Sequence, residues 1–185
     1  MCENLPPPTL KCVRSARDKF DEENQIVERA LEEIFKKYPK NSDPSHVLIK
    51  VATLNSLYST HIMAAVKVAE HIVNKNIDPC LESGDLNVIN MISTIRIKEK
   101  KRCFYSFATK YAAWHKPELY PIWDSRVDEY LWRMSKQTKF IGIRYRKNIR
   151  DYSCFYEVIT KFREHFGLGE CTLRDIDKFI WQISK

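Results

Sequence analysis

Apolar residues recur at helical spacing along most of this chain. Residues 21–38 carry apolar side chains three and four positions apart among many acidic residues, which predicts an amphipathic helix. Asp43 followed by Pro44 indicates the start of a second helix, because Asp caps the first free N–H groups and proline suits the first turn. The apolar stripe of that helix continues to Leu57.

The same spacing continues beyond Leu57. A third helix is predicted from Ser59 or Thr60 to about Asn74, and the short break before it indicates that the second and third helices pack as a hairpin. Further helices are expected over residues 85–95, 104–114, 124–133 and 153–165, and from residue 172 onward, where Thr172-x-x-Asp175 has the form of a capping box. The pattern therefore predicts an all-α protein of about eight helices.

Three segments lack this pattern. Residues 1–16 contain Pro6-Pro7-Pro8 and are expected to form a flexible or extended N-terminal arm, followed by a single α-helical domain over residues 17–185. The basic run 96–102 is predicted to form a turn. Residues 139–150 are basic and apolar and include Gly142, and their pattern indicates only a loop or a distorted segment.

Composition narrows the class of protein. The chain has 185 residues, of which 44% are apolar, and this suits a globular domain, while four glycines are too few for the many tight turns of an all-β sandwich. The six cysteines are scattered, without a C-x-x-C pair, which favours a reduced protein in the cytoplasm. No apolar run is long enough for a membrane span, so a membrane partner is not expected.

The net charge of +7 is unevenly distributed. Residues 94–150 contain fifteen basic and five acidic residues, so this segment carries +10 and the rest of the chain −3. A basic surface of this size concentrates polyanions and is commonly the footprint of a phosphate backbone. The charge therefore favours a nucleic-acid partner, with a solvated basic face as the alternative.

Residues 106–127 read S-F-A-T-K-Y-A-A-W-H-K-P-E-L-Y-P-I-W-D-S-R-V. The A-T-K-Y-A-A portion is similar to the lysine end of a G-V-G-x-K helix, and P-I-W-D-S-R-V is similar to a P-V-D-[TV]-H-V motif with one inserted residue. On these motifs, residues 45–133 resemble the helix-hairpin-helix (HhH-GPD) DNA glycosylases, nearest to the 8-oxoguanine and endonuclease III-like branches. Ser106 and Ala108 stand where that family has glycines.

The resemblance implies a helix-hairpin-helix glycosylase fold and a protein that flips a damaged or modified base out of duplex DNA and hydrolyses its N-glycosidic bond. It implies a catalytic carboxylate at Asp124 and a Schiff-base nucleophile at Lys110, which would add strand-nicking lyase activity. A carboxylate suits this reaction because the transition state resembles an oxocarbenium ion. The plainer alternatives are an N-cap for Asp124 and a solvated or phosphate-binding role for Lys110.

The helix pair after His46 is similar to the part of the family that lines the base pocket. Candidates for contacting a flipped base are the polar residues Asn55, Ser56 and Tyr58, and the aromatic residues Trp114 and Trp123. Polar residues at a helix end commonly form a cap or turn instead, and aromatic residues at this density are more often part of the core.

Phosphate contacts are expected from the basic residues around the Lys110 helix. These are Arg96, Lys98, Lys100, Lys101, Arg102, Arg126, Arg144, Arg146 and Lys147. The run 96–102 is the strongest candidate because it immediately precedes that helix, and an exposed turn without a partner is the alternative.

No metal or other cofactor is expected. The five histidines have no metal-ligand spacing, and the scattered cysteines exclude an iron–sulfur cluster of the kind that some glycosylases carry. Two other functions stay open: a noncatalytic nucleic-acid-binding protein on the same scaffold, and a protein-interaction module that uses the acidic first helix. The recognised base, the choice between DNA and RNA and the oligomeric state do not follow from the sequence.

Overall fold

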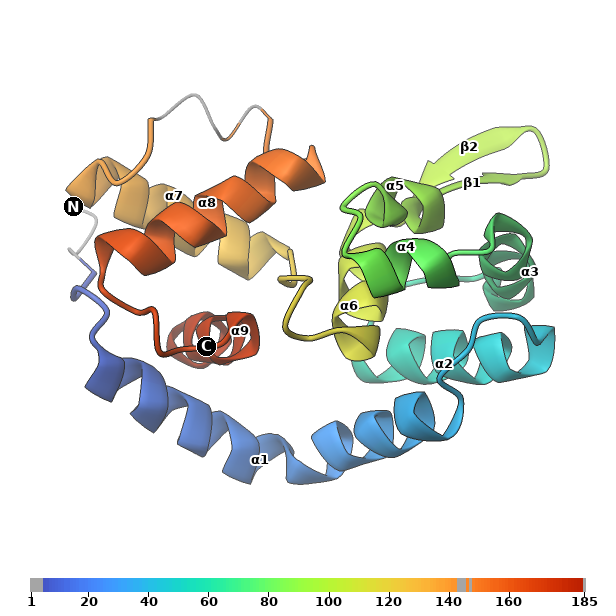
Figure 1. Cartoon of the computed structure of the whole chain (residues 1–185), viewed down its shortest axis with the longest axis horizontal. Coiled ribbons are helices and arrows are strands. Elements are labelled where there is room, and N and C mark those ends of the chain that lie inside the picture. The colour runs from blue at the N-terminus through green and yellow to red at the C-terminus, as the bar shows by residue number, and fades with distance from the viewer. Residues whose placement is uncertain (1–4, 143–145, 147, 185) are drawn as a thin grey trace. The chain divides into compact units, whose positions relative to one another are not determined.

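The computed structural model describes residues 5–142, 146 and 148–184. These residues form nine α-helices and one two-stranded antiparallel sheet (Figure 1). The elements are α1 (Leu10–Lys37), α2 (Pro44–Leu57), α3 (Ala65–Lys75), α4 (Asp78–Ser83), α5 (Val88–Ser93), β1 (Thr94–Ile97), β2 (Lys100–Cys103), α6 (Tyr105–His115), α7 (Ser125–Thr138), α8 (Tyr152–His165) and α9 (Leu173–Ile183). The mainly helical class predicted from the sequence is confirmed, with the addition of a small sheet.

The chain divides into two compact units. Unit 1 comprises Met1–Glu23 and Pro121–Lys185, and unit 2 comprises Asn24–Tyr120. The boundaries fall inside α1 and directly after Tyr120. The sequence predicted one domain over residues 17–185, and whether the two units unfold together is a question for a denaturation experiment.

Unit 2 is built on helices whose apolar faces meet. Helices α2 and α3 pack against each other, which confirms the predicted helical hairpin, and α5 packs on α6. The buried side chains that form this core include Leu31, Phe35, Val47, Val51, Leu54, Val68, Ile72, Ile89, Ile92, Phe107 and Ala108. Burial of such side chains stabilises each helix by roughly 1.5–3 kcal/mol per residue.

Helix α1 begins within the segment predicted to be a flexible arm, so the arm prediction is wrong from Leu10 onward. Two local signals explain the earlier start. The Thr9 hydroxyl oxygen accepts a hydrogen bond from the Cys12 N–H at 3.2 Å, which is an N-cap bond. Val13 and Phe20 are buried and lie seven positions apart, so they continue one apolar face by two turns.

Helix α3 begins at Ala65, later than the predicted start at residue 59 or 60. The intervening loop contains Ser59 and His61, which have positive φ angles of 48° and 57°. Asn55 organises this loop: its side-chain oxygen accepts from the Ile62 N–H at 2.8 Å and from the Thr60 hydroxyl at 3.0 Å. These bonds compete with a helical start at Ser59 or Thr60.

The basic run 96–102, predicted to be a turn, is instead part of an antiparallel hairpin (Figure 1). Ile97 pairs with Lys100, so the turn consists of Lys98 and Glu99. Lys98 has a φ of 53°, in the left-handed region that such two-residue turns require. The strands were missed because β1 contributes only one buried side chain, Ile95, and β2 is exposed along its length.

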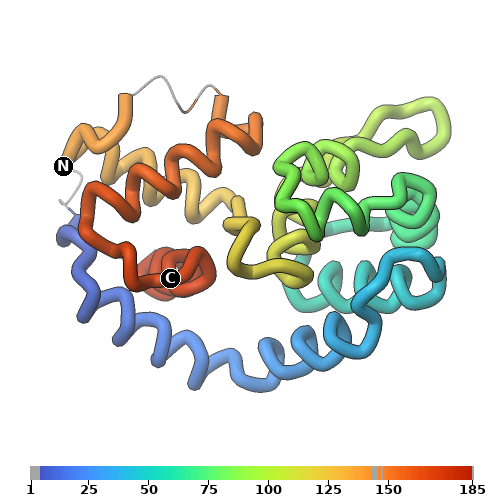
Figure 2. The backbone as a smooth tube through the Cα atoms, in the orientation of Figure 1, coloured from blue at the N-terminus to red at the C-terminus, as the bar shows by residue number. Residues whose placement is uncertain are grey.

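Unit 1 consists of α7, α8 and α9 together with the first part of α1, whose path can be followed in Figure 2. Its core includes the buried residues Val13, Phe20, Val127, Leu131, Phe155, Phe162, Ile176 and Phe179. A side-chain cap begins each of α7, α8 and α9: Asp124 and Asp151 accept bonds at the starts of α7 and α8, and Thr172 with Asp175 forms the predicted capping box of α9. Helix α7 continues to Thr138, five residues beyond its predicted end.

Among the residues that the structure describes, no helix combines the length and the apolar character needed to cross a membrane.

Candidate functional site

Lys110 lies on α6 in unit 2, and its side chain is buried, with 4% of the residue exposed. The ammonium group donates a hydrogen bond to the Ser106 hydroxyl, one helical turn earlier, at 2.8 Å. It also lies 5.5 Å from the centroid of the Tyr58 ring. Lys110 is therefore held inside unit 2 by a hydroxyl and an aromatic face, and it is not the solvated lysine of the plainer interpretation.

The structure brings two of the predicted base-pocket residues to Lys110. Tyr58 presents its ring to the lysine, and its hydroxyl oxygen accepts a hydrogen bond from the indole N–H of Trp114 at 3.3 Å. Lys110, Ser106, Tyr58 and Trp114 are defined here as the Lys110 cluster. Its members come from α6 and from the residue that follows α2.

The other predicted pocket residues have different surroundings. Asn55 uses its amide to hold the loop after α2, and its Nδ2 also donates to the Ile62 carbonyl at 3.0 Å. Ser56 is exposed on α2. Trp123 belongs to unit 1, apart from the unit that contains the Lys110 cluster. A base-reading role for these three residues stays a prediction.

Asp124 also belongs to unit 1, where it is the N-cap of α7. Its Oδ1 accepts hydrogen bonds from the backbone N–H groups of Arg126 and Val127, both at 3.0 Å. This is the capping role that the sequence offered as the plainer alternative. Capping uses the carboxylate as a hydrogen-bond acceptor and does not by itself exclude a role in chemistry.

The hairpin carries five exposed cations: Arg96, Lys98, Lys100, Lys101 and Arg102. Arg96 is paired directly with Lys101 across the two strands. Like charges in directly opposed positions destabilise a sheet, and a bound anion would relieve this repulsion. The hairpin is therefore electrostatically suited to a phosphate backbone.

The predicted phosphate contacts in unit 1 are arranged differently. The Arg146 guanidinium is 2.8 Å from the Glu129 carboxylate and 3.4 Å from the Asp128 carboxylate, so acidic residues already surround it. Arg126 is exposed, and its guanidinium lies 5.2 Å from the centroid of a Trp181 ring. Arg144 and Lys147 lie outside the described residues.

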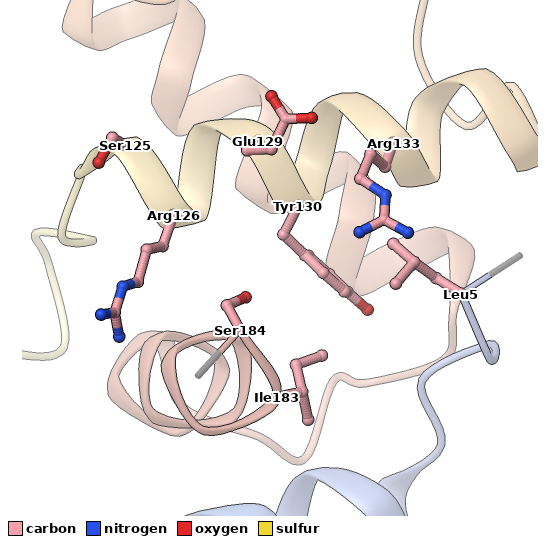
Figure 3. Close-up of a pocket in the computed structure, with 8 residues that line it drawn as sticks. All are labelled: Leu5, Ser125, Arg126, Glu129, Tyr130, Arg133, Ile183 and Ser184. Carbon is pink, nitrogen blue, oxygen red and sulfur yellow. The ribbon is translucent and has the colours of Figure 1, made fainter. Parts of the chain in front are cut away.

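Unit 1 also contains a pocket of about 270 Å³ between α7, α9 and the segment before α1 (Figure 3). It is lined by Leu5, Ser125, Arg126, Glu129, Tyr130, Arg133, Ile183 and Ser184. Arg126 and Arg133 project from α7 on either side of the Tyr130 ring, and Glu129 points away from that ring (Figure 3). Sequence reasoning included Arg126 as a phosphate contact but did not predict this pocket.

A second buried lysine, Lys50 on α2, is the centre of a polar network that sequence reasoning missed. Its ammonium donates to the Asn41 side-chain oxygen at 2.7 Å and to the backbone carbonyls of Tyr38 and Lys40 at 3.0 and 3.1 Å. It also lies 3.2 Å from His115 Nε2. The available signal was a lysine inside the apolar stripe of α2, between buried positions 47 and 54.

Asn41 connects this network to two further segments of unit 2. Its Nδ2 donates to Asp78 Oδ1 at 2.6 Å, and its Oδ1 accepts from the Tyr111 hydroxyl at 2.5 Å. Asp78 begins α4 and Tyr111 lies on α6. Lys50 and the four residues Asn41, Asp78, Tyr111 and His115 are defined here as the Lys50 network.

Burial shifts the proton equilibria in this network. It lowers the pKa of Lys50 from 10.5 to about 7, against the smaller opposing effect of the Asp78 charge. It also lowers the pKa of His115 to about 2, and the charges of Lys50 and Lys116 add to this effect. The histidine ring is therefore neutral at physiological pH, and its Nε2 can accept a hydrogen bond from the lysine.

Within the described part of the chain, His, Cys, Asp and Glu side chains do not gather in any group of three or more that could hold a metal ion.

A model of the protein family HI_0787_N, described as an N-terminal domain, matches residues 12–119. The chain belongs to this family. The match includes the hairpin and the Lys110 cluster, and it ends one residue before the end of unit 2 and ahead of Asp124.

A Haemophilus influenzae protein described as uncharacterized is 36% identical to this chain over 140 residues. The match covers 75% of this chain and 66% of the relative, so this chain spans just under two thirds of the length of the curated relative that it matches. No solved structure matches the chain. Neither description states an activity, so the function is argued from the geometry above.

Proposed function

We propose that this protein binds duplex DNA through the hairpin Thr94–Cys103 and removes a damaged or modified base, with Lys110 as the amine nucleophile. The observation that carries the proposal is the placement of these two features. The cationic hairpin leads directly into α6, on which Lys110 is buried against Tyr58. Base excision needs phosphate contacts and a sheltered reactive group, and this segment carries a candidate for each.

The hairpin supplies the phosphate contacts. Its five exposed cations outnumber its one carboxylate, Glu99, and the opposed pair of Arg96 and Lys101 favours an anion between or beside them. Binding through such cations would fall steeply as the salt concentration rises, because each neutralised phosphate releases counterions.

Lys110 supplies the nucleophile. In the proposed reaction, the lone pair of the deprotonated Nζ forms a bond to C1′ of the deoxyribose. The bond from C1′ to the base breaks, and its electron pair leaves with the base, which takes up a proton. The C1′–O4′ bond then breaks, its electron pair goes to O4′, which takes up a proton released from Nζ, and the opened sugar is left as a Schiff base between Nζ and C1′. Burial away from bulk water is one way in which proteins activate a lysine for this role.

Borohydride trapping on duplex DNA that contains an abasic site tests the lysine directly. Borohydride reduces a Schiff base to a stable amine, so the wild-type protein is expected to become covalently attached to the DNA. Lys110→Met is expected to lose the adduct, and Lys75→Gln, which removes an exposed lysine from α3 of the same unit, is expected to keep it. An adduct of equal yield in all three proteins would contradict the role of Lys110.

The sequence predicted Asp124 as the carboxylate that stabilises positive charge on the sugar, and this role stays a prediction. Asparagine caps helices about as well as aspartate, so Asp124→Asn removes the charge and preserves the start of α7. The variant is expected to lose base removal from damaged duplexes while its DNA affinity and thermal stability stay at the wild-type level. Undiminished base removal would leave Asp124 with its capping role alone.

A noncatalytic nucleic-acid-binding protein is the second candidate, and one observation favours it. Asp124 Oδ1 already accepts hydrogen bonds from two backbone N–H groups, and capping of α7 is enough to explain an aspartate at this position. This candidate predicts salt-dependent DNA binding by the wild-type protein, no trapped adduct and no base removal. Trapping and base-removal assays on the same preparation therefore separate the two functions.

A further inference from the structure

We infer that the pocket between α7 and α9 in unit 1 binds a small organic anion that has an acidic group at each end and an apolar middle. The inference concerns unit 1 alone and does not depend on the proposed action on DNA. It rests on the size of the pocket, on the spacing of its two arginines and on a buried hydroxyl group.

The size of the pocket indicates a small ligand. Pockets for drug-sized molecules have volumes of about 300–1,000 Å³, and this pocket, at about 270 Å³, lies just below that range. Its apolar lining comes from Leu5, Ile183 and the Tyr130 ring. A metabolite-sized molecule with some apolar surface fits this description better than a bare inorganic ion.

The spacing of the arginines indicates two acidic groups. Arg126 and Arg133 are seven residues apart on α7, which corresponds to two turns and about 10.5 Å along the helix axis. Figure 3 shows their guanidinium groups on opposite sides of the Tyr130 ring. Guanidinium groups bind carboxylates and phosphates through paired N–H donors, so each end of the pocket is suited to one anionic group.

Tyr130 provides a hydrogen-bond donor that the protein leaves unused. The residue is 4% exposed, and its hydroxyl oxygen has no hydrogen-bond partner among the described residues. Burial raises the pKa of Tyr130, so the hydroxyl stays protonated and can donate. A buried hydroxyl without a partner costs stability, and an anionic oxygen that reached it after a shift of Leu5 would recover that cost.

The carboxylate on the pocket lining does not cancel the positive charge. Glu129 points away from the Tyr130 ring in Figure 3 and is paired with Arg146 at 2.8 Å. The cationic residues on the pocket lining are Arg126 and Arg133.

Titration calorimetry with unbranched dicarboxylates tests the inference. Succinate, glutarate, adipate and suberate differ only in the distance between their acidic groups, and hexanoate has the chain length of adipate with one carboxylate. We expect saturable binding with an optimum of length within the dicarboxylate series. We expect the best dicarboxylate to bind at least about tenfold more tightly than hexanoate, because a charge-assisted hydrogen-bonded contact contributes about 1.5 kcal/mol or more.

Variants locate the binding. Arg126→Gln and Arg133→Gln are each expected to lower the affinity for the best dicarboxylate by at least about tenfold. Tyr130→Phe preserves the ring and is expected to lower this affinity by a smaller factor. The control Arg150→Gln changes an exposed arginine of unit 1 outside the pocket and should bind the dicarboxylate as the wild type does. Circular dichroism of each variant confirms that the helices are intact.

Three results would overturn the inference. One is the absence of saturable binding by every dicarboxylate. Another is equal affinity for hexanoate and the dicarboxylates, which would show that the second acidic group of the ligand does not contribute to binding. The third is a combination of two observations: duplex DNA displaces the dicarboxylate, and Arg133→Gln lowers the affinity for DNA and for the dicarboxylate equally. The pocket would then be a phosphate contact for DNA.

Discussion

Unit 2 buries two lysines, Lys50 and Lys110, in different ways. Lys50 is fully buried, and its ammonium donates to two backbone carbonyls and an amide oxygen. Lys110 has 4% of its surface exposed, and its described contacts are the Ser106 hydroxyl and the Tyr58 ring. The carbonyl acceptors of Lys50 belong to Tyr38 and Lys40, in the segment that follows α1.

The difference teaches what burial of a lysine does and does not indicate. Lys50 satisfies acceptors that the fold itself creates, so its position is explained by stability. Lys110 is held by side chains from α6 and the end of α2, among them the Ser106 hydroxyl and the Tyr58 ring. A search for reactive lysines in a structure would do better to ask what each lysine contacts than how deeply it is buried.

The largest expected effect is on stability when each lysine is replaced by methionine, which keeps the apolar stem. At pH 9 the Lys50 amine is neutral and has two N–H groups, so Lys50→Met is expected to lower the free energy of unfolding by about 3 kcal/mol, because buried acceptors lose their donor. Lys110→Met is expected to cost about 1 kcal/mol, for one hydroxyl contact and one aromatic contact. Urea denaturation followed by circular dichroism measures both, and equal costs would remove the distinction between the two lysines.

The next effect is a rise in stability with pH that depends on Lys50. Its pKa is about 7 in the folded protein and 10.5 in the reference state, so above pH 7 the unfolded chain holds a proton that the native state has released. Stability then rises with pH, by about 2 kcal/mol between pH 7 and pH 9. Urea denaturation at these two pH values should show the rise in the wild type and in Lys110→Met. A similar rise in the stability of Lys50→Met would show that other titrating groups cause the pH dependence.

His115 is expected to produce a smaller loss of stability in acid. Its pKa is about 2 in the folded protein, against 6.5 for the free side chain, so its contribution is complete above pH 6.5 and is lost as pH falls toward 2. Between pH 7.5 and pH 5.5 the loss is about 1.4 kcal/mol, because only the unfolded chain takes up the proton. Thermal or urea unfolding over this pH range should show that the stability of His115→Gln changes less with pH than that of the wild type. An unchanged pH dependence would count against assigning the loss to His115.

The smallest effect concerns the aromatic face beneath Lys110. Tyr58→Leu removes the ring and is expected to lower the free energy of unfolding by about 1 kcal/mol. Tyr58→Phe keeps the ring and removes the hydroxyl group, which accepts a hydrogen bond from Trp114, so about half that cost is expected. Denaturation of the two variants side by side measures the difference, and a larger cost for phenylalanine would show that the hydroxyl, not the ring, holds this cluster.

Much of the helical framework was predictable because its signals are local. Asp43 and Thr172 cap α2 and α9 as the sequence indicated, since a capping side chain bonds to residues two or three positions ahead. The early start of α1 had an equally local signal at Thr9, and the prolines before it drew the prediction toward an arm.

The rest depends on contacts between distant segments. Lys110 and Tyr58 were both selected from the sequence, but their proximity joins residues 52 positions apart. The Lys50 network gathers carbonyl, amide, hydroxyl and imidazole groups from segments between Tyr38 and His115, and no local pattern reports such a gathering. The hairpin was missed because its strands are mostly exposed and lack a typical turn pair such as Asn-Gly.

Lys98 at the tip of that hairpin exposes a conflict between folding and binding. A lysine with a φ of 53° costs about 1 kcal/mol more than a glycine in the same conformation. Lys98→Gly should therefore make the hairpin easier to form while removing a cation from its tip, so amide exchange in β1 and β2 should slow as DNA affinity falls. If Lys98→Gly stabilises the hairpin and weakens DNA binding, Lys98 serves the proposed contact at a cost to the fold.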